Sequence, residues 1–135
     1  MTSLLKIEGI GPAYAQTLRE KAGIRTVEAL LEAGATPQGR KELEEKTGIS
    51  GALILEWVNL ADLMRIKGVG EEYADLLEEA GVDTVRELQH RVPQNLWMKM
   101  QQVNVEKHLV RRLPSLRMVE DWVEQAKHLP PKVMY

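Results

Sequence analysis

The sequence predicts an all-α protein with two similar bundles of about four to five short helices each, packed together as one body. Three observations support this prediction. No stretch alternates apolar and polar residues over six or more positions, as a half-buried strand would. Residues that start and end helices recur along the whole chain. A segment near the N-terminus also returns, in similar form, about 60 residues later.

The internal repeat sets the expected division of the chain. Segment 7–18 reads IEGIGPAYAQTL and segment 66–77 reads IKGVGEEYADLL, with six identical residues at twelve aligned positions. Further along, Trp57 in the first copy corresponds to Trp122 in the second. We therefore expect a first copy over 1–64, a second and partly degenerate copy over 65–129, and an irregular tail over 130–135.

Capping residues and glycines locate the individual helices. In the first copy, helices are expected to start at Thr26, Thr36 and Ser50, and to end just before Gly34 and Gly48. The Ser50 helix is long and leads into the second copy without a flexible linker, which favours one rigid body. In the second copy, starts are expected at Thr84, Pro93, Asn104 and Ser115, with breaks at Gly81 and Pro114.

The turn around Gly9 and Gly11 is the candidate functional feature of the first copy. The glycines permit a tight turn, and Ile10 between them is expected to point into the core. The helix that follows offers free amide groups, which can bind a phosphodiester oxygen without reading a base. Because a β-branched residue adopts positive φ poorly, we expect Gly11→Val to be severely destabilising.

This turn resembles that of the helix-hairpin-helix family, whose members bind DNA independently of sequence and have a SAM-like bundle fold. The first copy further resembles the N-terminal domain of archaeal and eukaryotic RecA-like recombinases. The residues that carry this resemblance are Gly9–Ala13, Ala22–Ile24, Thr26–Leu30 and Leu43–Ser50.

In the recombinase domain two hairpins pair about a pseudo-twofold axis. The resemblance implies that Gly48-Ile49-Ser50 is the second hairpin of the first copy. Leu113-Pro114-Ser115 stands at the corresponding place in the second copy, so the fourth hairpin is degenerate. The whole chain also resembles a bacterial family of unknown function built from two such units.

From these features we predict a non-enzymatic module that binds the phosphate backbone of DNA or RNA. Lys21 and Arg25 could also surround the first turn. The candidate nucleic-acid-binding residues are Lys6, Gly9, Ile10, Gly11, Ala13, Tyr14, Arg19, Gly48 and Ser50 in the first copy, and Lys107, Arg111, Arg112 and Arg117 in the second.

The second glycine turn differs because carboxylates follow it. Glu71 and Glu72 open the next helix, and 71–87 holds seven acidic residues against Arg86 alone. Such a surface repels phosphate, so this turn is expected to be structural or to face a protein. The alternative function is therefore a protein-interaction or scaffolding module that uses the 71–87 face. A third interpretation is an accessory domain of a larger nucleic-acid enzyme, working in trans.

The tyrosines and tryptophans that match between the copies are expected to have structural roles. Trp57 and Trp122 are expected in the core, and Tyr14 and Tyr73 beside it with their hydroxyls at the surface. Trp97 has no counterpart, and we expect it either to cover the junction between the copies or to form a docking patch.

Composition narrows the remaining classes. The net charge is −2, so any nucleic-acid binding must depend on local patches. There is no cysteine, no secretory leader and no membrane-length apolar run, and we expect a cytoplasmic protein without contact to membranes. The three histidines lack metal-ligand spacing, and no catalytic motif is present. We expect no enzyme activity, cofactor, metal or small-molecule substrate, and the oligomeric state stays open.

Overall fold

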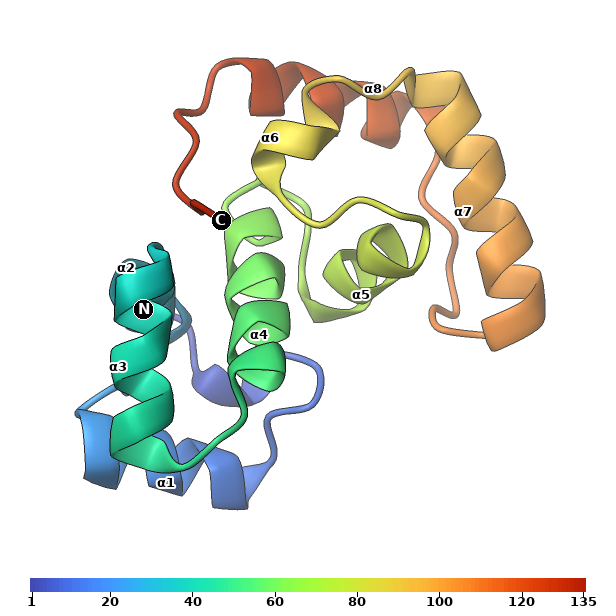
Figure 1. Ribbon diagram of the computed structural model, residues 1–135. Coiled ribbons are helices and arrows are strands. Elements are labelled where there is room, and N and C mark those ends of the chain that lie inside the picture. Colours follow the sequence, from blue (N-terminus) through green and yellow to red (C-terminus); the bar gives the residue numbers. More distant parts are fainter. The chain divides into compact units, whose positions relative to one another are not determined.

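The computed structural model describes residues 1–135 and is all-helical, which confirms the predicted fold class (Figure 1). Eight α-helices and one short 3-10 helix make up the regular structure. The only bridge between extended residues joins Ser3 to Thr26. The elements are η1 (Leu4–Lys6), α1 (Pro12–Ala22), α2 (Val27–Gly34), α3 (Pro37–Thr47), α4 (Gly51–Leu63), α5 (Glu71–Glu79), α6 (Val85–Leu88), α7 (Pro93–Lys107) and α8 (Leu116–Lys127).

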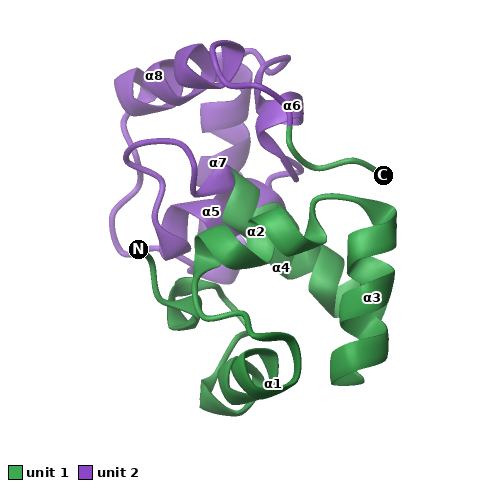
Figure 2. Cartoon of the chain, turned by 90° about the vertical axis from the view of Figure 1, so that its left-hand side faces the viewer, with its two compact units in different colours: residues 1–62, 132–135 green, residues 63–131 purple.

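The chain divides into two compact units, coloured separately in Figure 2. Unit 1 comprises Met1–Asp62 together with Lys132–Tyr135, and unit 2 comprises Leu63–Pro131. Unit 1 therefore contains η1, α1 to α3 and all but the last residue of α4, and unit 2 contains α5 to α8. The last four residues return to the unit with which the chain begins. The expectation that two bundles pack as one body stays a prediction.

Threonine caps start the helices of unit 1 where the sequence predicts them. The Thr26 hydroxyl accepts a hydrogen bond from the Ala29 amide at 3.0 Å, and the Thr36 hydroxyl accepts one from the Gly39 amide at 3.0 Å. Each cap satisfies an amide that the first turn of a helix leaves free. The helix α3 ends at Gly48, as expected, with φ of 74°.

Gly34 has a different role from the expected one. It lies within α2 and is buried, so it does not follow the end of the helix. A Cβ atom at this position would lie 2.5 Å from Val58 Cγ2 on α4. The missing side chain therefore lets α2 approach α4 closely, and packing explains this glycine better than helix termination.

The predicted starts in unit 2 are correct except for one. Thr84 and Ser115 cap α6 and α8 through their hydroxyls, and α7 begins at Pro93. The prediction that Asn104 starts a helix is wrong, because α7 continues through it. The Asn104 amide group instead accepts from the Val110 N–H at 2.9 Å and donates to the Val110 carbonyl at 3.1 Å. It thus fixes the loop that follows α7.

Each unit has its own core, and each core contains one tryptophan. Trp57 and Trp122 are both 1% exposed, as expected. Aliphatic side chains complete the cores, including Leu18, Leu30 and Ile54 in unit 1 and Leu76, Leu77 and Leu88 in unit 2. Trp97 is half-buried, and its indole N–H donates to the Pro114 carbonyl at 2.9 Å, so it anchors the loop between α7 and α8.

Candidate phosphate-binding sites

The first glycine turn connects η1 to α1, and its apolar side chains are buried in the core of unit 1. Ile7 and Ile10 are buried, and the Ile10 amide donates to the Ile7 carbonyl at 3.1 Å. Between them, Gly9 has φ of 94°, in the region that residues with a side chain rarely adopt. A Cβ atom at Gly9 would also lie 3.1 Å from Nε1 of Trp57. Both the backbone conformation and the nearby indole therefore require glycine here.

Gly11, the second glycine of the turn, is not constrained in this way. Its φ of −89° and ψ of −176° are extended, and a Cβ atom there would meet nothing within 4 Å. The expectation that Gly11→Val would be severely destabilising through a positive φ is therefore wrong, since Gly9 carries the positive φ. Gly11 precedes α1 without a side-chain cap, and Pro12 has no amide hydrogen, so the free N–H groups of the first turn are those of Ala13 and Tyr14.

The second glycine turn has the same local geometry in unit 2. Gly68 has φ of 95°, and a Cβ atom there would lie 3.1 Å from Nε1 of Trp122. Gly70 is extended and precedes α5 without a side-chain cap, as Gly11 precedes α1. Val69, like Ile10, is buried. The glycine, the apolar residue and the tryptophan therefore form the same arrangement twice.

A tyrosine on the next helix packs against each tryptophan. The Tyr14 and Trp57 ring centroids are 5.0 Å apart with an interplanar angle of 62°, and those of Tyr73 and Trp122 are 5.3 Å apart at 50°. The Tyr73 hydroxyl also donates to the Arg112 carbonyl at 2.9 Å. Tyr14 is 39% exposed. These positions agree with the expected semi-core role.

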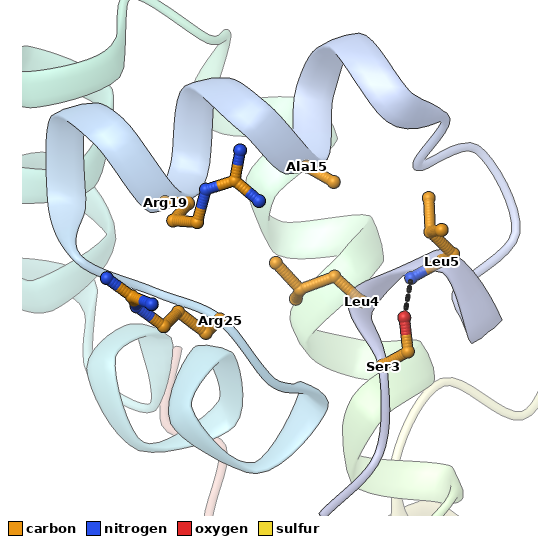
Figure 3. A pocket seen from close by; sticks show the side chains of 6 residues that line it. All are labelled: Ser3, Leu4, Leu5, Ala15, Arg19 and Arg25. Atoms are coloured by element: carbon orange, nitrogen blue, oxygen red, sulfur yellow. Dashed lines mark hydrogen bonds between the residues drawn. The ribbon is translucent and has the colours of Figure 1, made fainter.

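A pocket of about 300 Å³ lies between η1 and α1 in unit 1. Figure 3 shows Arg19 and Arg25 on one side of this pocket, with Ser3 and Leu5 on the other. Arg19 comes from α1, and Arg25 comes from the connection between α1 and α2. Neither guanidinium takes part in an ion pair, and no carboxylate lines the pocket. The structure thus brings together two basic residues that the sequence placed only near the turn.

The remaining candidates of unit 1 lie outside this pocket. Lys6 is exposed on η1, and Ala13 is exposed on the first turn of α1. Gly48 ends α3, and the Ser50 hydroxyl accepts from the Leu53 amide at 3.3 Å at the start of α4.

The Gly48-Ile49-Ser50 hairpin also differs from an open anion site. The Glu44 carboxylate accepts a hydrogen bond from the Gly51 amide at 2.7 Å. A carboxylate therefore already occupies the N-terminus of α4, where an anion would otherwise bind.

Unit 2 has its own pocket, of about 350 Å³, directly at the second glycine turn. Arg111 and Arg112 reach it from the loop between α7 and α8. The sequence pattern indicated only carboxylates at this turn, but the fold places two arginines beside them. The residues that line this pocket are Gly68, Gly70, Glu71, Glu72, Tyr73, Arg111 and Arg112.

The rest of the predicted basic cluster separates from this pocket. Lys107 forms an ion pair with Glu79, and the hydrogen bond to that carboxylate raises the pKa of Lys107. Arg117 is exposed on the first turn of α8 and does not line the pocket. Only Arg111 and Arg112 of this cluster therefore lie at the turn.

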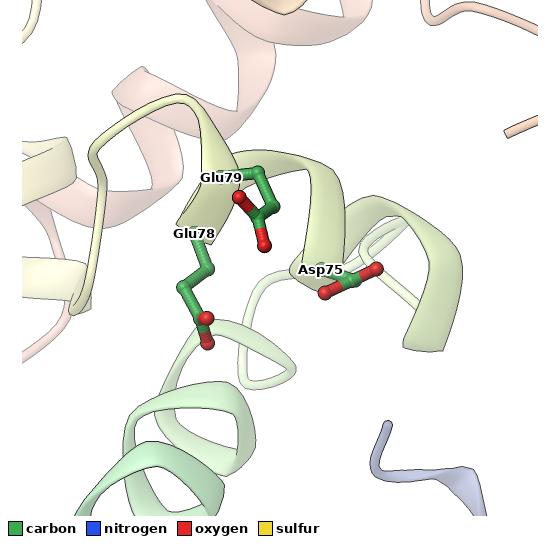
Figure 4. A group of neighbouring side chains, drawn as sticks. All are labelled: Asp75, Glu78 and Glu79. Carbon is green, nitrogen blue, oxygen red and sulfur yellow. The ribbon is translucent and has the colours of Figure 1, made fainter. Parts of the chain in front are cut away.

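The acidic residues of 71–87 likewise have several different environments. Asp75, Glu78 and Glu79 bring their carboxylate oxygens within 4.8 Å of one another on α5 (Figure 4). Because Glu79 already pairs with Lys107, we assign no metal to this cluster. Near α6, the Asp83 amide donates to the Glu87 carboxylate at 3.1 Å. Burial and the charge of Glu87 raise the pKa of Asp83.

No helix has the length and apolar character needed to cross a membrane.

Comparison with known proteins places the chain in a family. Neither the curated proteins nor the solved structures contain a match to the chain. A family model described as a domain of unknown function (DUF4332) matches residues 8–129. The expected resemblance to an uncharacterised family is confirmed, and the chain belongs to the DUF4332 family.

Proposed function

We propose that the protein is a non-enzymatic module that binds the phosphate backbone of nucleic acids without reading the base sequence. The observation that carries this proposal is the pocket of unit 1, where Arg19 and Arg25 face a space without any carboxylate. A guanidinium donates two parallel hydrogen bonds to phosphate oxygens, and two unpaired guanidinium groups attract a phosphate strongly.

The glycine turns support the proposal through their backbones. We interpret the turns before α1 and α5 as the hairpins of two helix-hairpin-helix units that arose by duplication. The nearly equal φ angles of Gly9 and Gly68, 94° and 95°, favour this interpretation, as does the tryptophan behind each. A side chain is missing at Gly11 and Gly70, so a phosphate could approach the free amides of the following helix.

The two units are expected to contribute unequally. Arg111 and Arg112 give unit 2 the same number of pocket arginines as unit 1. Glu71 and Glu72 line that pocket too, and their charges oppose those of the arginines. The opposite charges at the second turn therefore nearly cancel, and unit 1 is the stronger candidate for phosphate binding.

A protein-interaction role for the acidic 71–87 face is the second candidate. The internal contacts reduce the charge that this face can offer to a basic partner. Lys107 neutralises Glu79, and Arg111 and Arg112 lie near the two glutamates of the pocket. We therefore favour nucleic acid as the partner.

Salt-dependent binding tests the proposal. The affinity of the protein for unrelated single-stranded and duplex DNA oligonucleotides would be measured from low to physiological salt. We expect similar affinities for unrelated sequences and a logarithmic affinity that falls linearly with the logarithm of the salt concentration. The Arg19→Gln/Arg25→Gln variant should bind more weakly, with a salt slope reduced by about 2 in magnitude, roughly 1 for each lost phosphate contact.

A matched control removes the same charge elsewhere in unit 1. Lys41 and Lys46 are exposed on α3 and do not line the pocket, so Lys41→Gln/Lys46→Gln should leave the slope nearly unchanged. An equal loss of DNA affinity in the two double variants would show that binding depends only on net charge and not on the pocket. No binding by the wild type, even at the lowest salt, would rule out the proposed function.

A further inference from the structure

The C-terminal segment Lys132–Tyr135 is docked on unit 1 through main-chain hydrogen bonds. The Met134 amide donates to the Ala35 carbonyl at 2.7 Å, and the Arg40 guanidinium donates to the Met134 carbonyl at 2.6 Å. Both polar groups of the Met134 main chain are therefore satisfied by unit 1. This mode of recognition depends on the peptide backbone and tolerates many side chains at the bonded position.

Side chains of the segment alternate between the surface of unit 1 and solvent. Val133 is 6% exposed, and its neighbour Met134 is 61% exposed. Lys132 lies on the outer side and pairs with Glu32 at 3.6 Å. This alternation is typical of an extended peptide that inserts one side chain and points the next one away. Val133 is thus the apolar anchor of the segment.

Tyr135 supplies a second, more polar anchor. Its hydroxyl donates to Oδ1 of Asn59 at 3.0 Å, and Asn59 is nearly buried on α4. The Arg40 guanidinium lies 5.9 Å from the centre of the tyrosine ring, within the range of a cation–π contact. The ring itself stays largely in solvent, because Tyr135 is 65% exposed.

Arg40 connects these contacts and is unusual in itself. It is 9% exposed, although arginine is rarely so buried, and burial lowers the pKa of its guanidinium. Its two hydrogen-bond acceptors are the main-chain carbonyls of Gly34 and Met134. One of its acceptors thus belongs to the docked segment. A buried guanidinium that points at a peptide carbonyl is suited to hold an extended chain.

We propose that the groove formed by Ala35, Arg40 and Asn59 is a peptide-recognition site that residues 132–135 of the same chain occupy, and from which a partner protein displaces them. The partner presents an extended segment with a branched apolar residue two positions before a tyrosine. A basic residue just before the apolar one adds a pairing with Glu32. This site is separate from the arginine pocket and does not depend on the proposed nucleic-acid function.

Because residues 132–135 occupy the groove, a partner can bind there only when it displaces them. The segment is covalently part of the same chain, so a free peptide must compete with an intramolecular contact. A partner therefore binds only when it is locally concentrated or makes contacts beyond the groove. The groove would then couple partner binding to release of the C-terminal segment.

A peptide titration with the 135-residue chain tests this proposal. The probe is a fluorescent peptide with the sequence of residues 130–135, blocked at both ends. The Val133→Ser/Tyr135→Ala variant weakens both anchors and opens the groove. It should bind the probe at least ten-fold more tightly than the wild type, whose own segment competes. Adding Arg40→Gln to this variant should reduce probe binding at least ten-fold.

Two controls keep the result interpretable. A probe with aspartate in place of the valine should not bind, because the charge cannot enter the apolar site. Circular dichroism checks that each variant keeps its helices. If the double variant unfolds, the milder Tyr135→Ala chain takes its place and should show an intermediate gain.

The proposal is overturned if a folded variant fails to bind the probe at millimolar concentration. Binding that is equal with and without Arg40→Gln would overturn it as well.

Discussion

The two glycine turns have almost the same backbone but different surroundings. Gly9 and Gly68 have φ angles of 94° and 95°, and the indole nitrogen behind each lies at the same 3.1 Å from a Cβ atom placed on the glycine. After the turn, Pro12 and Ala13 begin α1, whereas Glu71 and Glu72 begin α5. The comparison shows that the turn and its tryptophan determine the local shape, and that neighbouring side chains determine which charge the turn attracts.

The arginines of the two pockets also come from different places, and only the pocket of unit 2 includes residues of its glycine turn. In unit 1, Arg19 and Arg25 lie soon after the turn in sequence. In unit 2, Arg111 and Arg112 come from a loop about 40 residues after the turn, and the Tyr73 hydroxyl holds that loop by its carbonyl. The two pockets therefore take their arginines from different parts of their units.

The largest change in the free energy of unfolding is expected when serine replaces the glycine of positive φ in either turn. Gly9→Ser and Gly68→Ser should each lower the free energy of unfolding by about 2 kcal/mol, because a side chain is strained there and meets the indole. Gly11→Ser and Gly70→Ser should change it by less than about 0.5 kcal/mol, since serine suits an extended cap position. Urea denaturation measures all four variants.

Equal losses at both glycines of one turn would contradict the assignment of strain to the first. A loss in one unit only would show that the two turns are not equivalent in energy.

A smaller effect is expected from the two tyrosines. Tyr73→Phe removes the donor to the Arg112 carbonyl and should cost about 1 kcal/mol. Tyr14→Phe should be nearly neutral, because the ring contact with Trp57 remains. Denaturation gives the free energies, and hydrogen exchange of residues 108–115 reports whether the loop loosens only in Tyr73→Phe. Unchanged exchange in that variant would mean that Trp97 and Asn104 hold the loop without the Tyr73 hydrogen bond.

The smallest change in stability is expected at the residue that precedes the capping threonine. This residue is Arg25 in unit 1 and Asp83 in unit 2. Burial and Glu87 raise the pKa of Asp83 above its ordinary value of 3.8, so its charge opposes folding at neutral pH. Asp83→Asn should therefore stabilise the protein at pH 7, but by less than about 0.5 kcal/mol because solvent screens this partly exposed carboxyl. The gain should shrink as the pH falls through the raised pKa and vanish below 3.8, where the wild type is also uncharged.

Unfolding curves of both proteins at pH 7 and pH 3 measure this difference. A gain that is the same at both values would mean that titration of Asp83 is not its cause.

Local signals in the sequence predicted most of the helices and the two turns. Thr26, Thr36, Thr84 and Ser115 cap helices as expected, because a cap bonds an amide two or three residues away. Asn104 misled the prediction, since asparagine is common both at helix starts and in the turns that follow helices, and the residue type alone does not separate the two.

Long-range contacts could not be predicted in this way. The placement of Arg111 and Arg112 at the second turn depends on how α7 packs on α5, and no pattern of neighbouring residues encodes that packing. The tail was expected to be irregular, and it is not helical, but its docking depends on a buried Arg40 that nothing in its local sequence sets apart. The alternating exposure from Lys132 to Met134 is too short to be recognised as a pattern.

The return of residues 132–135 to unit 1 has a consequence for synthesis on the ribosome. Translation adds about 5–20 residues per second, so all of unit 2 is made during several seconds after the rest of unit 1 has been completed. During this interval the guanidinium of Arg40 and the carbonyl of Ala35 are exposed to water or to whichever chain reaches them first. The nascent chain therefore exposes these two groups for a period before residues 132–135 are made and cover them.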